Sequence, residues 1–174
     1  MADLEDTLLL IEANSNTSRL MAEHFTATGY HVIVHASVDD YLTTADRCEP
    51  QVIIADCTPL DVARILDVFG SSNGAPPVIA NSEIQSADCL LTYLRSGVAD
   101  IVPLPLTDFS ILDKAVERQM EKVRLYRENR QYRLELESVN KELRAGLEEL
   151  QADLDVWMHV QMKKLPERDI DING

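Results

Sequence analysis

Lysine is absent from the first 113 residues of this 174-residue chain, and the first lysine is Lys114. Over residues 1–106 there are 15 acidic residues and only four arginines. The whole chain carries a formal net charge of −14. Because binding to nucleic acid needs Lys and Arg side chains that face phosphates, this charge distribution argues against direct nucleic-acid binding.

Cysteine and long apolar runs are also scarce. Cys48, Cys57 and Cys89 are odd in number and lack the spacing of metal ligands, which is typical of a reducing cytoplasm. No apolar run approaches the ~18 residues of a membrane span. The N-terminal sequence MADLEDT is acidic, unlike a signal peptide. We therefore expect a cytoplasmic protein without a membrane partner.

Short apolar runs alternate with amphipathic stretches over residues 8–106. The runs are LLLI (8–11), YHVIV (30–34), QVIIA (51–55), PVIA (77–80) and DIVPL (100–104). Between them we expect helices near 16–28, 38–47, 60–69 and 84–96. Apolar strands that alternate with helices predict a parallel sheet covered on both faces. The fold class is therefore α/β, a flavodoxin-like (βα)5 domain with five strands.

Polar side chains follow several of these strands. Glu12 follows the first, Asp56 follows the third in QVIIADCTPLD, and Ser82 follows the fourth. A carboxylate at the end of an apolar strand is costly unless something uses it. In doubly wound sheets, sites form at the carboxyl ends of the strands. We therefore expect Glu12 and Asp56 to meet, with Ser82 at the rim.

These residues resemble the receiver domain of two-component response regulators, over roughly residues 6–122. By position, Asp56 matches the phosphoacceptor of that family and Glu12 the first of its two acidic residues. Ser82 matches the switch hydroxyl, and Pro105 the proline after the lysine. The resemblance implies that a histidine kinase or a phosphotransfer protein phosphorylates Asp56.

Several positions depart from the family pattern. Ala13 stands in place of the second acidic residue, Leu104 in place of the lysine, and Ile101 where an aromatic switch residue often lies. The spacing from Asp56 to Pro59 is one residue shorter than usual. The active-site residues of the receiver family are therefore only partly present in this sequence.

These departures weaken the chemistry of the site. A phosphorylated carboxylate normally needs magnesium and a lysine to neutralise the added charge. Glu12, Asp56 and the backbone carbonyl near Thr58 form the candidate magnesium site, but Ala13 removes one anionic ligand. We expect weakened magnesium binding and impaired phosphorylation of Asp56.

The composition changes at Thr107. No glycine follows until Gly146 and no proline until Pro166. Thr107 or Asp108 can cap a helix that continues for more than 50 residues, which is too long for a single globular helix.

Apolar residues of this helix recur at heptad spacing and predict a parallel homodimer through a coiled coil over residues 123–165. Asn129 falls at an a position, where asparagine fixes a two-stranded register. Near Gly146 the spacing changes, a stutter that locally unwinds a supercoil. The alternative is a helix that packs back on its own domain. The seam residues are Leu125, Asn129, Tyr132, Leu136, Val139, Leu143, Leu147, Leu150, Leu154 and Trp157.

The end of the chain resembles the entry to SpoIIE-like, PPM-type serine phosphatase domains. It has Gln161 followed by Leu165–Pro166 and IDING, and none of the metal-binding aspartate motifs of such a phosphatase. The resemblance implies that residues 166–174 begin an output domain, which would act on an anti-sigma-factor antagonist. The fragment itself is not expected to be an enzyme.

Two functions follow from the sequence. The first is a receiver (residues 1–122) that dimerises and regulates a C-terminal output. The second is a stand-alone pseudo-receiver adaptor that binds a partner protein without phosphotransfer. A nucleotide-binding enzyme is excluded, because no strand is followed by a glycine-rich phosphate loop.

Overall fold

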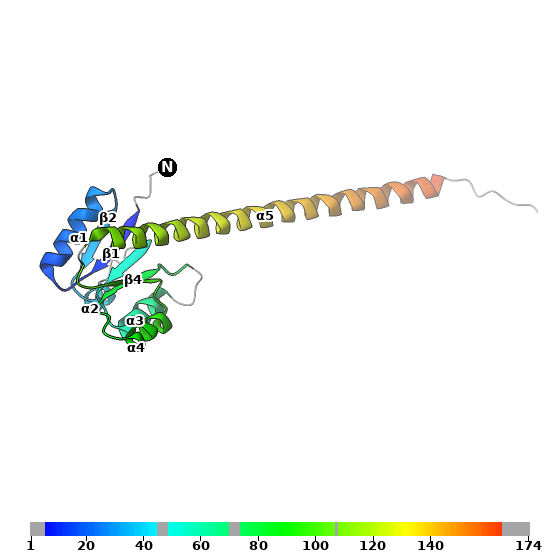
Figure 1. The fold of residues 1–174 in the computed structure, drawn as a ribbon. Helices are drawn as coiled ribbons and strands as arrows, with labels where there is room; N and C mark the ends of the chain where they lie inside the picture. The colour runs from blue at the N-terminus through cyan, green and yellow to red at the C-terminus, as the bar shows by residue number, and fades with distance from the viewer. Residues whose placement is uncertain (1–5, 45–48, 70–73, 107, 165–174) are drawn as a thin grey trace, which may run out of the picture. The chain divides into compact units, whose positions relative to one another are not determined.

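The computed structural model describes residues 6–44, 49–69, 74–106 and 108–164. It contains a five-stranded parallel sheet in the order β2-β1-β3-β4-β5 (Figure 1). The strands are β1 (Thr7–Ile11), β2 (His31–His35), β3 (Val52–Ala55), β4 (Val78–Ser82) and β5 (Asp100–Pro103). The helices are α1 (Ser15–Ala27), α2 (Val38–Thr43), α3 (Pro59–Phe69), α4 (Ala87–Ser96) and α5 (Phe109–Lys164). The flavodoxin-like fold predicted from the apolar runs is confirmed.

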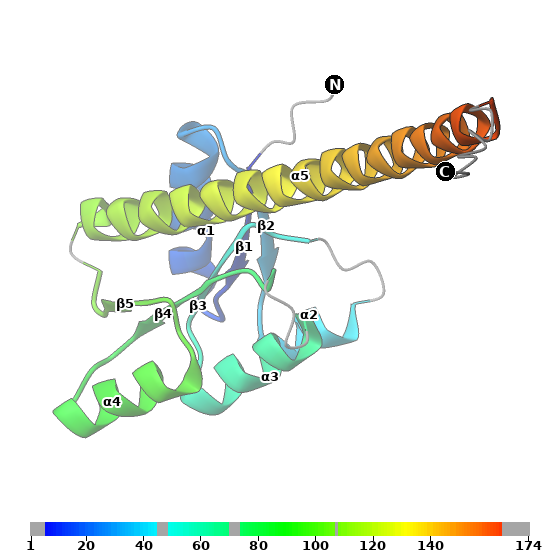
Figure 2. The ribbon, with the colours of Figure 1, turned by 90° about the vertical axis from the view of Figure 1, so that its right-hand side faces the viewer.

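Alternate strand residues supply two cores, one on each face of the sheet. On one face, Leu10 packs in a cluster with Phe25 of α1 and Leu112 of α5. On the other face, Leu9 packs in a cluster with Ile65 of α3. Figure 2 shows α1 and the start of α5 on one side of the sheet, with α2, α3 and α4 on the other. Each fully buried Leu or Ile side chain contributes about 1.5–3 kcal/mol, so these two clusters hold the layers together.

Polar contacts attach the first turns of α5 to the domain. The Nε2 atom of His24 in α1 lies 2.7 Å from Oδ1 of Asp113. Arg118 donates to a carboxylate oxygen of Asp100 in β5 at 2.7 Å. The Asp108 carboxylate accepts the backbone N–H of Ser110 at 2.9 Å, as expected of a residue at the start of a helix.

The long helix has a different character farther along. The chain divides into two compact units, Met1–Tyr126 and Arg127–Gly174. Helix α5 contains 56 residues, which confirms the prediction of a helix longer than 50. Every side chain from Arg124 to Lys163 is exposed in the single chain. The described helices include none that is long and apolar enough to cross a membrane.

Two helix boundaries differ from those expected. Helix α4 begins at Ala87 and not near residue 84, because the Ser86 side chain caps it by accepting the Cys89 N–H at 3.2 Å. Helix α2 ends at Thr43, because Thr44 is extended. Thr107 and the stretch from Leu165 to the end of the chain, including the phosphatase-like element, lie outside the described residues.

Candidate functional site

Two carboxyl groups follow neighbouring strands at one edge of the sheet. Glu12 follows β1 and Asp56 follows β3, and these strands pair with Ile11 beside Ala55. The ladder continues past the strand ends, because the Asp56 N–H donates to the Ile11 carbonyl at 2.9 Å. The next register position therefore places Glu12 beside Asp56.

Both carboxyl groups are harder to ionise than usual. Glu12 is only 5% exposed, and its burial raises its pKa. A hydrogen bond from the Asn14 N–H opposes this rise, and the charge of Asp56 adds to it. Asp56 is exposed as a whole residue, but its carboxyl group is partly shielded from water, and this shielding raises its pKa. The negative charge of Glu83 raises the pKa further. The edge is thus an acidic site that favours protons or cations.

The three altered positions supply no charge to this edge. Ala13 is exposed directly after Glu12. Leu104 is half-buried after β5, its N–H donates to the Ser82 carbonyl at 3.0 Å, and the Leu104–Pro105 peptide bond is cis. Ile101 is half-buried within β5. An aliphatic side chain therefore follows the last strand, where the family has an ammonium group.

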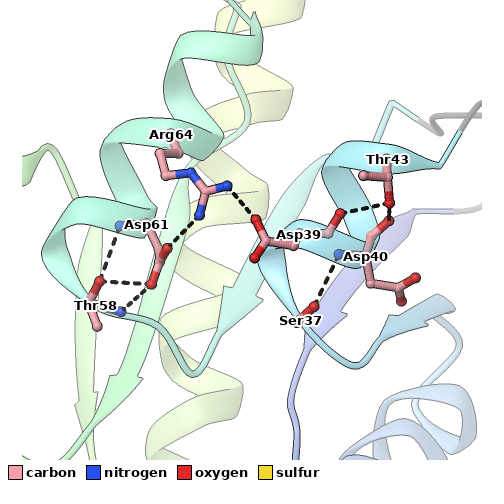
Figure 3. A network of polar contacts seen from close by, with 7 residues as sticks. All are labelled: Ser37, Asp39, Asp40, Thr43, Thr58, Asp61 and Arg64. Carbon is pink, nitrogen blue, oxygen red and sulfur yellow. Dashed lines mark hydrogen bonds and ion pairs between the residues drawn. The ribbon is translucent and has the colours of Figure 1, made fainter.

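The arginine on α3 is already paired. Arg64 donates to Asp61 at 3.1 Å and also contacts the Asp39 carboxylate on α2 (Figure 3). Burial opposes ionisation of Asp61, but hydrogen bonds from Thr58 and Arg64 outweigh it and lower the pKa of this carboxyl. Arg64 therefore joins α2 to α3 and does not compensate the charge of Asp56.

Thr58 forms the cap of α3. Its Oγ1 accepts the Asp61 N–H at 3.3 Å, and its own N–H donates to Asp61 Oδ2 at 3.2 Å, a reciprocal capping arrangement (Figure 3). Its carbonyl accepts the Val62 N–H at 3.1 Å. The candidate carbonyl ligand therefore also takes part in the first turn of α3.

Ser82 lies at the end of β4 and contacts a tyrosine that the sequence did not single out. The hydroxyl oxygen of Tyr93 in α4 lies 2.8 Å from Ser82 Oγ and 2.7 Å from the Cys57 carbonyl oxygen. A carbonyl can only accept, so the phenol proton goes to Cys57 and the Ser82 hydroxyl donates to Tyr93. The Cys57 thiol itself is buried, which raises its pKa to about 12 and leaves it inert.

A second unpredicted residue is Asn81, one position before Ser82 in β4. Asn81 is 1% exposed, and neither atom of its side-chain amide has a hydrogen-bond partner among the described residues. Strand alternation places Asn81 on the same face of the sheet as Ile79, which belongs to the core beneath α1 and α5. A buried, unpaired amide is destabilising. The one signal that the sequence carries for it is an asparagine directly after the continuous apolar run at 77–80.

The donor set at this edge is reduced for magnesium, because Ala13 supplies no carboxylate. Magnesium demands near-octahedral oxygen ligands. Glu12 and Asp56 offer two carboxylates, and the carbonyls of Cys57 and Thr58, which each accept one hydrogen bond, retain a second lone pair. Within the described part of the chain, no group of three or more His, Cys, Asp or Glu side chains is placed to hold a metal ion.

Solved structures of response regulators share the fold of this chain. NtrX from Brucella abortus, in complex with ADP, aligns with a TM-score of 0.64 and 18% identity over 75% of this chain and 29% of NtrX. The chemotaxis protein CheY4 of Vibrio cholerae aligns with a TM-score of 0.58 and 16% identity over 66% of this chain and 98% of that one. A response regulator from Thermotoga maritima aligns with a TM-score of 0.59 and 16% identity over 68% and 99% of the two chains.

These alignments show that the chain has the receiver fold. The chain spans less than a third of the length of NtrX. No protein-family model matches the sequence, and the search of curated proteins found no match.

Proposed function

We propose that the chain is the receiver module of a two-component response regulator and that Asp56 is its phosphoacceptor. The observation that carries the proposal is the position of Asp56 in a receiver fold, at the carboxyl end of β3 and beside the buried Glu12. A carboxylate there can attack a phosphoryl donor from the open edge of the sheet.

Phosphorylation at this edge is impaired. The phosphoryl group adds negative charge beside Glu12 and Glu83, and Leu104 offers no ammonium group. Weak magnesium binding leaves this charge largely uncompensated. We expect Asp56 to be modified slowly, by a histidine kinase, a phosphotransfer protein or a small phosphodonor.

The test is incubation with magnesium and acetyl phosphate, followed by intact mass measurement. A phosphoryl adduct adds about 80 Da and is expected on the native chain and on the control Asp88→Ala, but not on Asp56→Ala. Asp88 is an exposed aspartate in the first turn of α4. An adduct that persists in Asp56→Ala would contradict the assignment.

We further propose that α5 joins two copies of the chain. The apolar seam residues are exposed in the single chain, with Leu136 at 63% and Leu143 at 61%. Leucines at such spacing bury their side chains when a second helix covers them. The domain arrangement is then a receiver over 1–122, a dimerising helix over 123–165 and the start of an output domain over 166–174.

Charges beside the seam favour a parallel pair. With Asn129 at a, Glu128, Glu135 and Glu142 fall at g and Arg133 at e. In a parallel dimer Glu128 faces Arg133 of the partner subunit, whereas in an antiparallel dimer the glutamates at g face one another. The parallel arrangement pairs opposite charges and avoids repulsion.

Sedimentation equilibrium tests the dimer. Leu136→Asp places an unpaired charge in the seam and is expected to weaken self-association about 100-fold. Leu134→Asp is the matched control, because Leu134 is 59% exposed but falls at the outward f position. Equal association of both variants would contradict the seam.

The proposed output is a serine phosphatase domain that acts on an anti-sigma-factor antagonist in the cytoplasm. The support is the sequence resemblance at Gln161 and Leu165–Pro166. Sequencing the gene beyond codon 174 tests it. A downstream sequence that does not encode a phosphatase domain would contradict the proposal.

A stand-alone pseudo-receiver adaptor is the second candidate. The aliphatic Leu104 favours it, because it supplies no ammonium group to neutralise a phosphoryl group. Exposed leucines on α4, Leu90, Leu91 and Leu94, offer a docking face for a partner protein. Failure of the native chain to form the acetyl phosphate adduct would favour this candidate.

A further inference from the structure

Tyr93 is the single described residue of α4 whose side chain is buried, at 4% exposure. The leucines of the same helix, including Leu90, Leu91 and Leu94, are exposed. The attachment of α4 to the ends of β3 and β4 therefore depends heavily on the Tyr93 ring and on the two hydrogen bonds of its hydroxyl.

The directions of these two hydrogen bonds mean that the Ser82 hydroxyl donates its proton to Tyr93. Because the phenol proton goes to the Cys57 carbonyl, Ser82 donates its only proton to the Tyr93 oxygen. Burial raises the pKa of Tyr93 above its ordinary value of 10.0, so the phenol keeps its proton over the physiological range. Ser82 has no second proton for an anion bound at the edge.

We infer that Tyr93 is a latch that holds α4 to the strand ends through Ser82, and that a phosphoryl group on Asp56 competes with Tyr93 for the Ser82 hydroxyl. The competition rests on the proposed phosphoacceptor role of Asp56, whereas the latch itself does not. A serine side chain changes rotamer without backbone movement, so the hydroxyl can leave Tyr93 for the anion. Tyr93 is a positioning residue in this scheme, because it acts through Ser82.

The Ser82 hydroxyl gains free energy when it exchanges Tyr93 for a phosphoryl oxygen, but this exchange has an energy barrier. A hydrogen bond to a phosphoryl oxygen is charge-assisted and stronger than the neutral bond to a phenol. The neutral bond must first be broken, which slows adduct formation about two- to tenfold, the factor expected from one ordinary hydrogen bond. Once Ser82 leaves, Tyr93 retains only its bond to Cys57, and α4 is held less tightly.

The experiment uses Tyr93→Phe, which removes one oxygen atom and keeps the ring. Tyr126→Phe is the matched control, because Tyr126 lies on α5, is 43% exposed and is not one of the seam residues. Ser82→Ala and the double variant complete a cycle that isolates the interaction between the two hydroxyl groups. Two quantities are measured on the full chain: amide hydrogen exchange in Ala87–Ser96 without any ligand, and the rate of adduct formation with magnesium and acetyl phosphate.

For the latch, Tyr93→Phe is expected to accelerate exchange in α4 about tenfold, Ser82→Ala less, and Tyr126→Phe not at all. Unchanged exchange in Tyr93→Phe would overturn the latch. For the competition, Tyr93→Phe is expected to form the adduct two- to tenfold faster when Ser82 is present and to have no effect in the Ser82→Ala background.

The two failures are distinguishable. Equal adduct rates in the native chain and Tyr93→Phe would overturn the competition. An acceleration that persists without Ser82 would also overturn it, because Tyr93 would then act only by loosening the fold. If no variant forms an adduct, the phosphoacceptor role and the competition are both refuted, and the exchange measurement decides the latch.

Discussion

Two leucines of the same helix show how differently the two units of the chain are built. Leu112 in the first turns of α5 is 0% exposed and lies in the core under α1, whereas Leu136 farther along is 63% exposed. The first unit buries its apolar residues against its own sheet. The second displays a row of apolar side chains that the single chain does not cover. The first unit is thus stabilised within one chain, whereas the second is the part for which we propose a partner helix.

The largest expected effect tests this contrast directly. Leu112→Ala leaves a cavity in a packed core and is expected to lower the free energy of unfolding by about 2–5 kcal/mol at any protein concentration. Leu136→Ala is expected to cost little in dilute solution and more as the concentration rises. Urea denaturation at two concentrations measures both. A large, concentration-independent loss in Leu136→Ala would indicate that the helix packs back on its own domain.

A second variant sharpens the contrast within the first unit, where one buried residue breaks the apolar pattern. Asn81→Leu replaces an unpaired amide by an apolar group of similar size and is expected to raise the free energy of unfolding by about 1–3 kcal/mol. Asn16→Leu, at an exposed position of α1, is the control and should change little. Destabilisation by Asn81→Leu would mean that the amide has a partner, such as an ordered water molecule.

The cap of α3 is expected to matter less. Thr58→Ala removes the side chain that accepts the Asp61 N–H, and it should lower the free energy of unfolding by about 1 kcal/mol. Thr92→Ala in α4 is the comparison, because its hydroxyl only donates to a carbonyl within its own helix, that of Asp88. Thermal unfolding followed by circular dichroism measures both variants, and equal losses would argue against the capping role.

The smallest effect concerns the pH dependence of stability. Folding raises the pKa of Glu12 above its ordinary value of 4.5, so the folded chain holds this proton more tightly than the unfolded chain. The resulting stabilisation is complete below pH 4.5 and is lost as the pH rises through the folded pKa. Glu12→Gln keeps an acceptor for the Asn14 N–H and should remove this part of the pH dependence. If the pH dependence of stability is the same in Glu12→Gln as in the native chain, the role of Glu12 is contradicted. Glu23→Gln, at an exposed position, is the control.

Much of the fold could be predicted from the sequence because its signals are local. Each apolar run formed a strand, and the stretch after Thr107, without glycine until Gly146 and without proline until Pro166, predicted the long helix. The positions of Glu12 and Asp56 after their strands followed from the same pattern. The N-cap at Ser86 shifted the start of α4, because a side-chain hydrogen bond sets a boundary more sharply than apolar spacing does.

The contents of the site could be predicted less well. Tyr93 reads as one more apolar residue of an amphipathic helix, and only the packing of α4 brings its hydroxyl to Ser82 and Cys57. The engagement of the Thr58 carbonyl depends on where α3 begins. The pairing of Arg64 with Asp39 joins residues 25 positions apart.

The sequence by itself determined the elements, the acidic edge and the absence of a lysine to neutralise it, because composition and periodicity are properties of the chain. Only the tertiary structure decided which hydrogen-bonding groups at that edge remain free. That outcome depends on contacts between strand ends and helices distant in sequence, where one hydroxyl proton serves a single partner. The Ser82 proton is committed in this way to Tyr93, 11 positions farther along the chain.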